Sequence, residues 1–307
     1  MAQPLLARLR EKLPGIEIDA IAPPWVAPVL RRMPEVREVV EAPFEHGRLQ
    51  LGERWRLGRS LAARRYDQAI VLPNSWKSAL VPFFADVPLR SGYVGEKRYG
   101  LLNLVYGNEK PRERSMPLHY AALSEAPGKA PPEPLPAPRL AIDAEEIRRA
   151  QQRFGIAPPY AVFCPGAEYG PAKRWPYFDS LSSSLKIPVV LLGSPKDAEA
   201  AGNIAGKNLV GKTTLDEAIA VIAGAAYVVS NDSGLMHVAA ALGRPQVALF
   251  GSSSPLHTPP QSAAARVLWL RLECSPCFAR ECPLGHFRCM RELAVDKVLA
   301  EIQNLAQ

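Results

Sequence analysis

Several common features are missing from this 307-residue chain, and each absence argues against a class of protein. Hydrophobic residues make up 48%, yet no apolar run approaches the roughly 18–20 residues of a membrane span. The start, Met1-Ala2-Gln3-Pro4, has no basic stretch followed by an apolar core, so we expect no secretory signal. Basic residues are dispersed, without a compact basic motif or a stacked-aromatic signature, which argues against nucleic acid as a partner.

Phosphate-binding signatures are absent or out of context. No G-x-G-x-x-G motif follows a predicted strand, which argues against a nicotinamide dehydrogenase. Residues 206–213 fit the P-loop pattern G-x-x-x-x-G-K-[ST], but a true P-loop runs from a strand into a helix. Here a helical stretch comes first and a predicted strand, 208–210, lies inside the pattern. We therefore expect no P-loop.

The chain does have an excess of basic residues: 37 Lys and Arg against 30 Asp and Glu give a net charge of +7. Phosphorylated substrates, nucleic acid and an anionic membrane face all suit this balance. Charge alone therefore selects no function.

Two series of alternating strands and helices predict two α/β domains with parallel sheets. Predicted strands lie at 16–21, 36–40, 68–72, 160–164, 187–192, 208–210, 227–230 and 247–250. Residues 126–138 contain six prolines, which predict a semi-rigid linker. We place one domain at 1–138 and the second at 139–307, with the active site in the cleft between them.

Helix signals support the second series. Residues 214–217 have capping-box form and predict a helix start. Apolar residues from Met290 to Leu305 share one helical face, which predicts that the chain finishes on an amphipathic helix.

The most informative stretch is 226–242. It predicts a buried strand, an abrupt turn at Asp232, Ser233 and Gly234, and then a helix. A second apolar run follows and ends in the small polar turn 251–254. In an open parallel sheet, phosphate-bearing ligands sit at such turns, against helix N-termini. A capped helix without any ligand fits the spacing equally well.

Four segments resemble the heptosyltransferase family, glycosyltransferase family 9, whose GT-B fold has two facing Rossmann-like domains. They are Leu72 to Ala79 (LPNSWKSA), Phe163 to Pro176 (FCPGAEYGPAKRWP), Ser230 to Ala241 and Cys274 to His286 (CSPCFARECPLGH). The second and fourth are specific to the branch that acts on the first heptose of the lipopolysaccharide inner core. The resemblance implies inverting, metal-independent transfer of L-glycero-D-manno-heptose from ADP-heptose to that sugar.

The donor site is expected in the second domain. Lys173 follows a strand and a small-residue loop, so its ammonium can reach the diphosphate as charge builds, and the family has a matching lysine there. Asp232 repels phosphate and suits a cap or a hydroxyl contact better. Surface roles for Lys173 and Arg174, and core packing of His237, are the alternatives. The predicted donor residues are Lys173, Arg174, Gly193, Ser194, Thr213, Asp232, Ser233, Gly234 and His237, with Lys173 catalytic.

The acceptor, heptosyl-Kdo-lipid A, is expected on the first domain. It carries carboxylates and phosphates, which basic side chains match. The predicted contacts are Asn74, Ser75, Lys77, Lys97 and Arg98. A generic basic surface facing anionic lipid headgroups is the alternative. The resemblance also implies a cytoplasmic enzyme, peripheral on the inner face of the cytoplasmic membrane.

Four of the five cysteines are clustered, as Cys274, Cys277, Cys282 and Cys289, with His286 among them. This density suggests a zinc or iron–sulfur site. A cytosolic setting disfavours disulfides, and the resemblance implies no metal, so we expect no metal and no cofactor.

Two other functions remain open: a sugar-nucleotide epimerase of the same fold, and an inactive sugar-nucleotide-binding fragment. The family opens with a strand, a Gly-Asp turn carrying the proposed base, and a helix. Met1 to Leu9 resembles the interior of that helix. We therefore expect the central first strand and the aspartate to lie upstream, the first domain to fold poorly, and the chain as written to be inactive.

Overall fold

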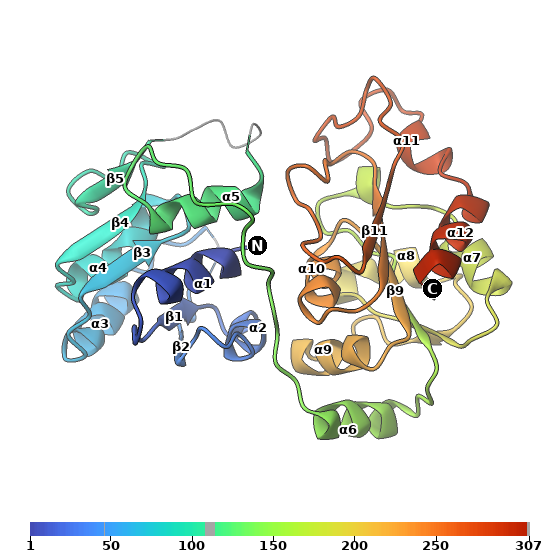
Figure 1. Ribbon diagram of the computed structural model, residues 1–307, viewed down its shortest axis with the longest axis horizontal. Helices are drawn as coiled ribbons and strands as arrows, with labels where there is room; N and C mark the ends of the chain where they lie inside the picture. The colour runs from blue at the N-terminus through green and yellow to red at the C-terminus, as the bar shows by residue number, and fades with distance from the viewer. Residues whose placement is uncertain (46, 108–113, 306–307) are drawn as a thin grey trace. The chain divides into compact units, whose positions relative to one another are not determined.

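The computed structural model describes residues 1–45, 47–107 and 114–305, which form two compact units (Figure 1). The N-terminal unit contains residues 2–27 and 35–136, and the C-terminal unit contains Met1, residues 28–34 and the chain from Ala137. Between Glu125 and Asp143, which include the proline-rich stretch, the chain has no helix or strand.

Residues 28–34 belong to the C-terminal unit, which the predicted division at 138 did not include. Arg32 forms ion pairs with Glu146 and Asp216, and its carbonyl accepts a hydrogen bond from the Ala141 amide at 2.8 Å. Val29 packs against the C-terminal core. The periodicity of apolar residues cannot predict contacts between residues so far apart in the sequence, so this part of the division could not be foreseen.

The N-terminal unit has two separate parallel sheets. One pairs β1 (Asp19–Ala22) with β2 (Glu38–Glu41), and the other has the order β3 (Gln68–Val71), β4 (Leu89–Tyr93), β5 (Leu104–Tyr106). Among the described residues no strand joins β1 to β3. The three predicted strands are confirmed with slightly shifted bounds, whereas β4 and β5 were not predicted.

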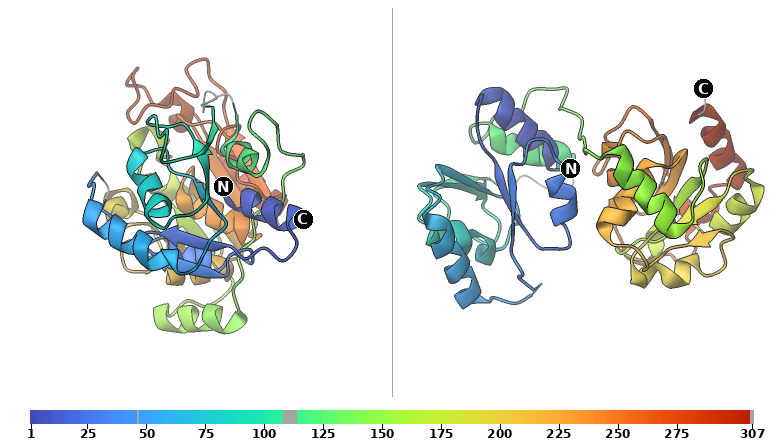
Figure 2. Two further views of the ribbon diagram at one scale, coloured as in Figure 1. Left: turned by 90° about the vertical axis from the view of Figure 1, so that its left-hand side faces the viewer. Right: turned by 90° about the horizontal axis from the view of Figure 1, so that it is seen from below.

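The described helices of the N-terminal unit are α1 (Gln3–Lys12), α3 (Leu51–Ala62), α4 (Leu80–Phe84) and α5 (Met116–Ala121), with the 3-10 turns η1 (Trp76–Ala79) and η2 (Ala122–Ser124). Helix α2 (Ala27–Arg31) lies almost entirely in the C-terminal unit. Helix α1 lies beside α5, where Leu5 packs near Tyr120 (Figure 2). Helices α3 and α4 approach closely at Gly58, where an added Cβ would lie 2.5 Å from the Phe84 Cβ.

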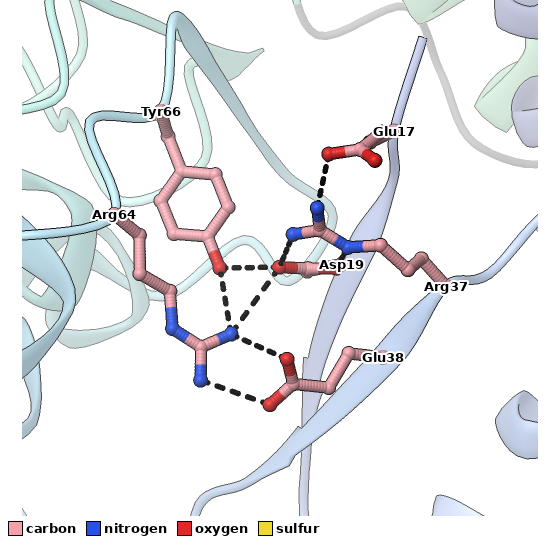
Figure 3. Close-up of polar contacts among 6 residues, drawn as sticks. All are labelled: Glu17, Asp19, Arg37, Glu38, Arg64 and Tyr66. Carbon is pink, nitrogen blue, oxygen red and sulfur yellow. Dashed lines mark hydrogen bonds and ion pairs between the residues drawn. The ribbon is translucent and has the colours of Figure 1, made fainter. Parts of the chain in front are cut away.

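A polar cluster links the two sheets of the N-terminal unit at their amino edge (Figure 3). Asp19 on β1 accepts hydrogen bonds from the Arg37 Nε and Nη2 at 2.8 and 2.6 Å, and from the Tyr66 hydroxyl at 2.6 Å. Arg64, just before β3, pairs with Glu38 on β2 at 2.8 Å. The Asp19 carboxylate is 3% exposed, so its charge is stabilised by these donors rather than by water. The cluster therefore ties β1 and β2 to the segment that enters β3.

We predict that Asp19→Asn destabilises the N-terminal unit at neutral pH. Hydrogen bonds from Arg37 lower the pKa of Asp19, although burial acts in the opposite direction. The stabilisation is present above the ordinary aspartate pKa of about 4 and is lost as the pH falls through the lowered pKa. Because its arginine partners are partly solvated, we expect about 1 kcal/mol.

Urea unfolding at neutral and at acidic pH measures this difference. Asp86→Asn is the matched control, because Asp86 pairs with Arg59 at 2.7 Å but its side chain is 74% exposed. Equal effects of the two substitutions, or an Asp19 effect that does not shrink in acid, would contradict the assignment.

The C-terminal unit is built on one parallel six-stranded sheet of order β11-β10-β9-β6-β7-β8. Its strands are β6 (Ala161–Cys164), β7 (Val189–Leu191), β8 (Lys207–Asn208), β9 (Tyr227–Asn231), β10 (Gln246–Phe250) and β11 (Ala265–Trp269). The five strands predicted here are confirmed, and the edge strand β11 was not predicted. The apolar runs of β6, β7 and β10 are buried along their whole length, as expected of strands covered on both faces.

Helices cover both faces of this sheet. Helices α6 (Ala144–Phe154), α9 (Leu215–Ala223) and α10 (Gly234–Ala241) pack on one face, and α7 (Phe178–Ser184), α8 (Ala198–Ala201), α11 (Arg288–Arg291) and α12 (Val295–Leu305) on the other. The capping box is confirmed at Thr214 and Glu217. The P-loop reading is excluded as expected, because β8 lies inside residues 206–213. Across the described ranges, no helix combines the length and apolarity of a membrane span.

The predicted amphipathic terminal helix is confirmed as α12, but the apolar pattern begins earlier, in α11, and residues 292–294 separate the two helices. Two side chains from the segment that enters α7 donate hydrogen bonds to the carbonyls at this break. The Trp175 indole donates to the Leu293 carbonyl at 2.8 Å, and the Tyr177 hydroxyl donates to the Arg291 carbonyl at 2.9 Å. These bonds replace helical ones, so the amphipathic pattern continues while the helix does not.

Candidate functional site

The carboxyl ends of β6, β7, β9 and β10 meet at one edge of the C-terminal sheet, since the strands are parallel. Four polar or small-residue segments follow them: 165–176, 193–197, 231–234 and 251–258. The predicted donor residues Lys173, Asp232 and Ser233 lie in these segments. This edge is the position at which open α/β sheets bind ligands.

Lys173 and Asp232 form a direct ion pair across the edge. The Lys173 Nζ lies 2.5 Å from the Asp232 Oδ2, and the side chains are 16% and 5% exposed. The Thr258 hydroxyl donates to the same carboxylate at 3.4 Å, and the ammonium lies 5.1 Å from the Tyr169 ring centroid. The lysine is thus held, mostly buried, beside the first residues of α10.

Asn231 fixes the Lys173 segment to the end of β9. Its Nδ2 donates to the Pro165 carbonyl at 2.8 Å, and its Oδ1 accepts from the Trp175 amide at 3.2 Å. The side chain is completely buried. One amide therefore holds both ends of the loop that carries Lys173.

The N-terminus of α10 is open to a ligand. Ser233 occupies the N-cap position but makes no capping hydrogen bond, because its hydroxyl lies 3.1 Å from the Ser230 hydroxyl instead. A Cβ added to Gly234 would meet nothing within 4 Å. Burial lowers the pKa of His237, one turn further, to about 4, so its imidazole is neutral at neutral pH. The helix end thus presents amides, not a histidine cation, to an anion.

The remaining predicted donor residues have mixed environments. The Ser194 amide and hydroxyl both donate to the Asp197 carboxylate, at 2.9 and 2.8 Å, so this serine caps the turn η4 (Pro195–Asp197). Gly193 accepts a backbone hydrogen bond from Gly211 at 3.0 Å, which brings the loop of Thr213 to the same edge. Arg174 has only a distant carboxylate partner, Glu199 at 4.0 Å.

Sequence reasoning missed several polar groups of this edge. Asn231 and Thr258 contact the segments described above, and Ser252 and Ser253 have buried hydroxyls that find no hydrogen-bond partner in the described part of the chain. Buried hydroxyls without partners are uncommon and are candidates for ligand contact. The signal for the serines was the small polar turn after β10, which was noted without being assigned.

The cysteine-rich loop packs against the Lys173 segment. The Tyr169 hydroxyl donates to the Phe278 carbonyl at 2.6 Å, and the Ala172 amide donates to the Arg280 carbonyl at 3.0 Å. Gly170 permits this contact, since a Cβ there would lie 2.4 Å from the Arg280 oxygen. The loop therefore helps to position the lysine.

The four loop cysteines and His286 line one small cavity. Across residues 1–45, 47–107 and 114–305, no three His, Cys, Asp or Glu side chains converge in an arrangement that could hold a metal ion. All five cysteines are free thiols.

We predict that Cys282 is alkylated more readily than Cys164 and Cys289. Burial opposes its ionisation, but backbone N–H groups, with Phe287 at 3.4 Å, outweigh this and lower its pKa. Burial raises the pKa of Cys289 to about 11 and that of Cys164 to about 12. At neutral pH the thiolate, the reactive form, is therefore more populated at Cys282 than at Cys164 or Cys289. Peptide mass spectrometry after brief iodoacetamide treatment checks the order, and earlier labelling of Cys164 or Cys289 would contradict it.

The predicted acceptor residues lie on two touching loops of the N-terminal unit, after β3 and β4. The Glu96 amide donates to the Asn74 carbonyl at 3.1 Å. Lys97 is exposed, whereas the Lys77 ammonium donates to the Arg48 carbonyl at 3.1 Å.

Arg98 has a different environment from its neighbour, because it is only 1% exposed. Its guanidinium donates to the carbonyls of Pro73 at 2.6 Å and Tyr93 at 2.5 Å. Arg98 therefore holds the two loops together from within.

Comparisons with known proteins show which sequences and structures this chain resembles. The model of glycosyltransferase family 9 (heptosyltransferase) matches residues 54–288. Lipopolysaccharide heptosyltransferase 2 of Escherichia coli (strain K12) is 43% identical over 327 residues, covering 99% of this chain and 94% of the relative. Lipooligosaccharide heptosyltransferase 2 of Haemophilus influenzae is 42% identical over 294 residues, covering 88% and 84%.

The solved structure of E. coli ADP-heptose lps heptosyltransferase II superimposes with a TM-score of 0.87 at 41% identity, covering 99% of this chain and 93% of that one. The predicted α/β architecture of two Rossmann-like units, the GT-B fold, is confirmed by this likeness. The chain belongs to glycosyltransferase family 9, the heptosyltransferase family.

Proposed function

We propose that the C-terminal unit binds ADP-heptose at the edge formed by β6, β7, β9 and β10. The observation that carries the proposal is Lys173, a mostly buried cation held beside the uncapped N-terminus of α10. A diphosphate placed there meets an ammonium and several free backbone N–H groups. Both favour anions, through charge and through the helix dipole.

In the proposed reaction, Lys173 stabilises the ADP leaving group. Negative charge grows on the diphosphate as the bond to the heptose breaks, and a preorganised cation lowers the energy of that state. Asp232 keeps the ammonium in place and, with Thr258, offers oxygens to hydroxyl groups of the donor. Because Lys173 and the α10 amides supply this positive charge, we infer that transfer needs no divalent metal.

The acceptor in this proposal is the first heptose of the lipopolysaccharide inner core, bound by the N-terminal unit at the cytoplasmic face of the membrane. Exposed Asn74 and Lys97 are suited to contact its hydroxyl, carboxylate and phosphate groups. Arg98 acts indirectly in this scheme, because its guanidinium is occupied by loop carbonyls. The relatives' names supply the substrate class.

Product analysis tests this function. ADP-heptose is incubated with heptosyl-Kdo-lipid A, and the lipid and nucleotide fractions are analysed by mass spectrometry. The proposal predicts a lipid product heavier by one heptose and one equivalent of released ADP. Conversion of ADP-heptose to an isomer would instead identify an epimerase, and binding without turnover would identify a sugar-nucleotide-binding protein.

A further inference from the structure

We propose that an exposed apolar surface of the N-terminal unit, formed by Leu49, Leu51, Trp55 and Trp76, inserts into a membrane that contains anionic lipids. We call it the aromatic surface. Its residues come from the start of helix α3 and from the turn η1 (Figure 1). The inference rests on the proposed function, because an enzyme acting on a lipid-linked sugar must work at a bilayer.

Three hydrogen bonds place the two segments of the aromatic surface side by side. The Arg54 Nε donates to the Leu49 carbonyl at 2.7 Å, and its Nη1 donates to the Lys77 carbonyl at 3.2 Å. The Lys77 ammonium donates to the Arg48 carbonyl at 3.1 Å. Arg54 itself is buried. Residues 48–55 and 76–77 thus form one continuous piece of surface.

The apolar side chains here are unusually exposed. Leu49, Leu51, Trp55 and Trp76 are 39%, 49%, 52% and 42% exposed. Helix α3 buries Arg54, Gly58 and Leu61, whereas Leu51, in its first turn, and Trp55 remain exposed. Neighbouring exposed apolar residues of this kind mark an interaction surface. Tryptophan and leucine together suit the boundary between lipid headgroups and acyl chains.

Basic and acidic residues both adjoin the aromatic surface, and the Glu96 carboxylate accepts a hydrogen bond from the Trp76 amide at 3.0 Å. The Arg48 and Arg56 side chains are 71% and 73% exposed, and Lys97 is exposed on the adjoining loop. Glu45 and Glu53 contact the two arginines at 3.0 and 3.9 Å, but both contacts are solvent-exposed and therefore weak. Arginine beside tryptophan on an exposed helix face is the composition of helices that lie on anionic membranes.

The position of the surface agrees with a lipid-anchored acceptor. Trp76 immediately precedes Lys77 and follows Asn74 and Ser75, in the loop that we propose for acceptor binding. A bilayer bound at Trp76 would therefore place the sugar headgroups of its lipids next to that loop. Sugar stacking alone would not explain the two exposed leucines.

The test compares vesicle binding and transfer in two double variants. Sedimentation with vesicles of equal parts phosphatidylethanolamine and phosphatidylglycerol measures binding. We expect Leu51→Ser with Trp55→Ala to lower the partition coefficient about tenfold or more. The control, Leu13→Ser with Leu89→Ser, removes residues 50% and 37% exposed, at the C-terminal end of α1 and at the first position of β4, and it should bind as the wild type does.

Transfer assays separate lipid binding from sugar binding. The first double variant should lose transfer to acceptor presented in vesicles and retain transfer to a delipidated, soluble acceptor. Equal loss with both acceptors would mean that the surface binds sugar, and unchanged vesicle binding would also overturn the proposal. ADP binding by the wild-type chain, measured separately, reports on the donor site, so its failure is distinguishable from failure of the membrane surface.

Discussion

Lys173→Ala is expected to lower kcat/KM for ADP-heptose at least tenfold and to weaken ADP binding. One charge-assisted contact is worth about 1.5–3 kcal/mol, and the contact strengthens as the diphosphate gains charge. The lysine is held 2.5 Å from Asp232 and is mostly buried, so no mobile surface lysine can replace it. Steady-state transfer assays and calorimetric titration with ADP measure both effects.

Lys196→Ala is the matched control for this prediction. Lys196 follows the neighbouring strand β7, but it is 76% exposed, and its carboxylate partner Glu168, at 3.1 Å, is exposed as well. Its removal should leave turnover and ADP affinity unchanged. Because Lys173→Ala leaves Asp232 buried without its cation, thermal unfolding of each variant is measured alongside. A folded Lys173→Ala protein with wild-type ADP affinity and turnover would disprove the proposed role.

Asn231→Ala is expected to produce the largest loss of stability among single changes at the site. It removes the partner of the Pro165 carbonyl and of the Trp175 amide, which are both buried. Each unsatisfied group costs about 1–3 kcal/mol, so we expect the free energy of unfolding to fall by about 2–4 kcal/mol. Urea denaturation measures the change, and weaker ADP binding should accompany it because the Lys173 loop loses its anchor.

Asn208→Ala provides the comparison for Asn231→Ala. The Asn208 Oδ1 also accepts a backbone hydrogen bond, from the Val210 amide at 3.0 Å, but this asparagine is partly solvated at β8. Water can replace the lost partner there, so a loss below about 1 kcal/mol is expected. If the two substitutions destabilise the protein equally, the buried hydrogen bonds of Asn231 do not hold the Lys173 loop in the way that the structure indicates.

Short apolar runs predicted most of the strands, including β10, whereas β4, β5 and β11 were not predicted. Residues 247–250 of β10 are apolar and fully buried. Strand β4, in contrast, contains Arg90, Ser91 and Gly92, which weaken a strand pattern. Arg90 is accommodated because its guanidinium donates to the carbonyls of Leu101 and Val87. Such tertiary hydrogen bonds leave no local signal.

The candidate site was predictable residue by residue but not as a set of contacts. Lys173 and Asp232 were singled out from their places after strands and from the family resemblance, yet they are 59 positions apart. Their ion pair exists because β6 and β9 are neighbours in the sheet. Arg98 is a case in which the sequence suggested a ligand contact, because it is a basic residue in a polar loop. The structure shows instead that its side chain is buried.

Hydrogen–deuterium exchange with and without saturating ADP tests most directly that the nucleotide binds at this edge. The account predicts slower exchange in segments 165–176 and 230–237, which contain Lys173 and the start of α10. Protection should extend to 251–258, where Ser252 and Ser253 have free buried hydroxyls. Protection confined to residues 206–213, the P-loop-like stretch, or to the N-terminal unit would contradict the account.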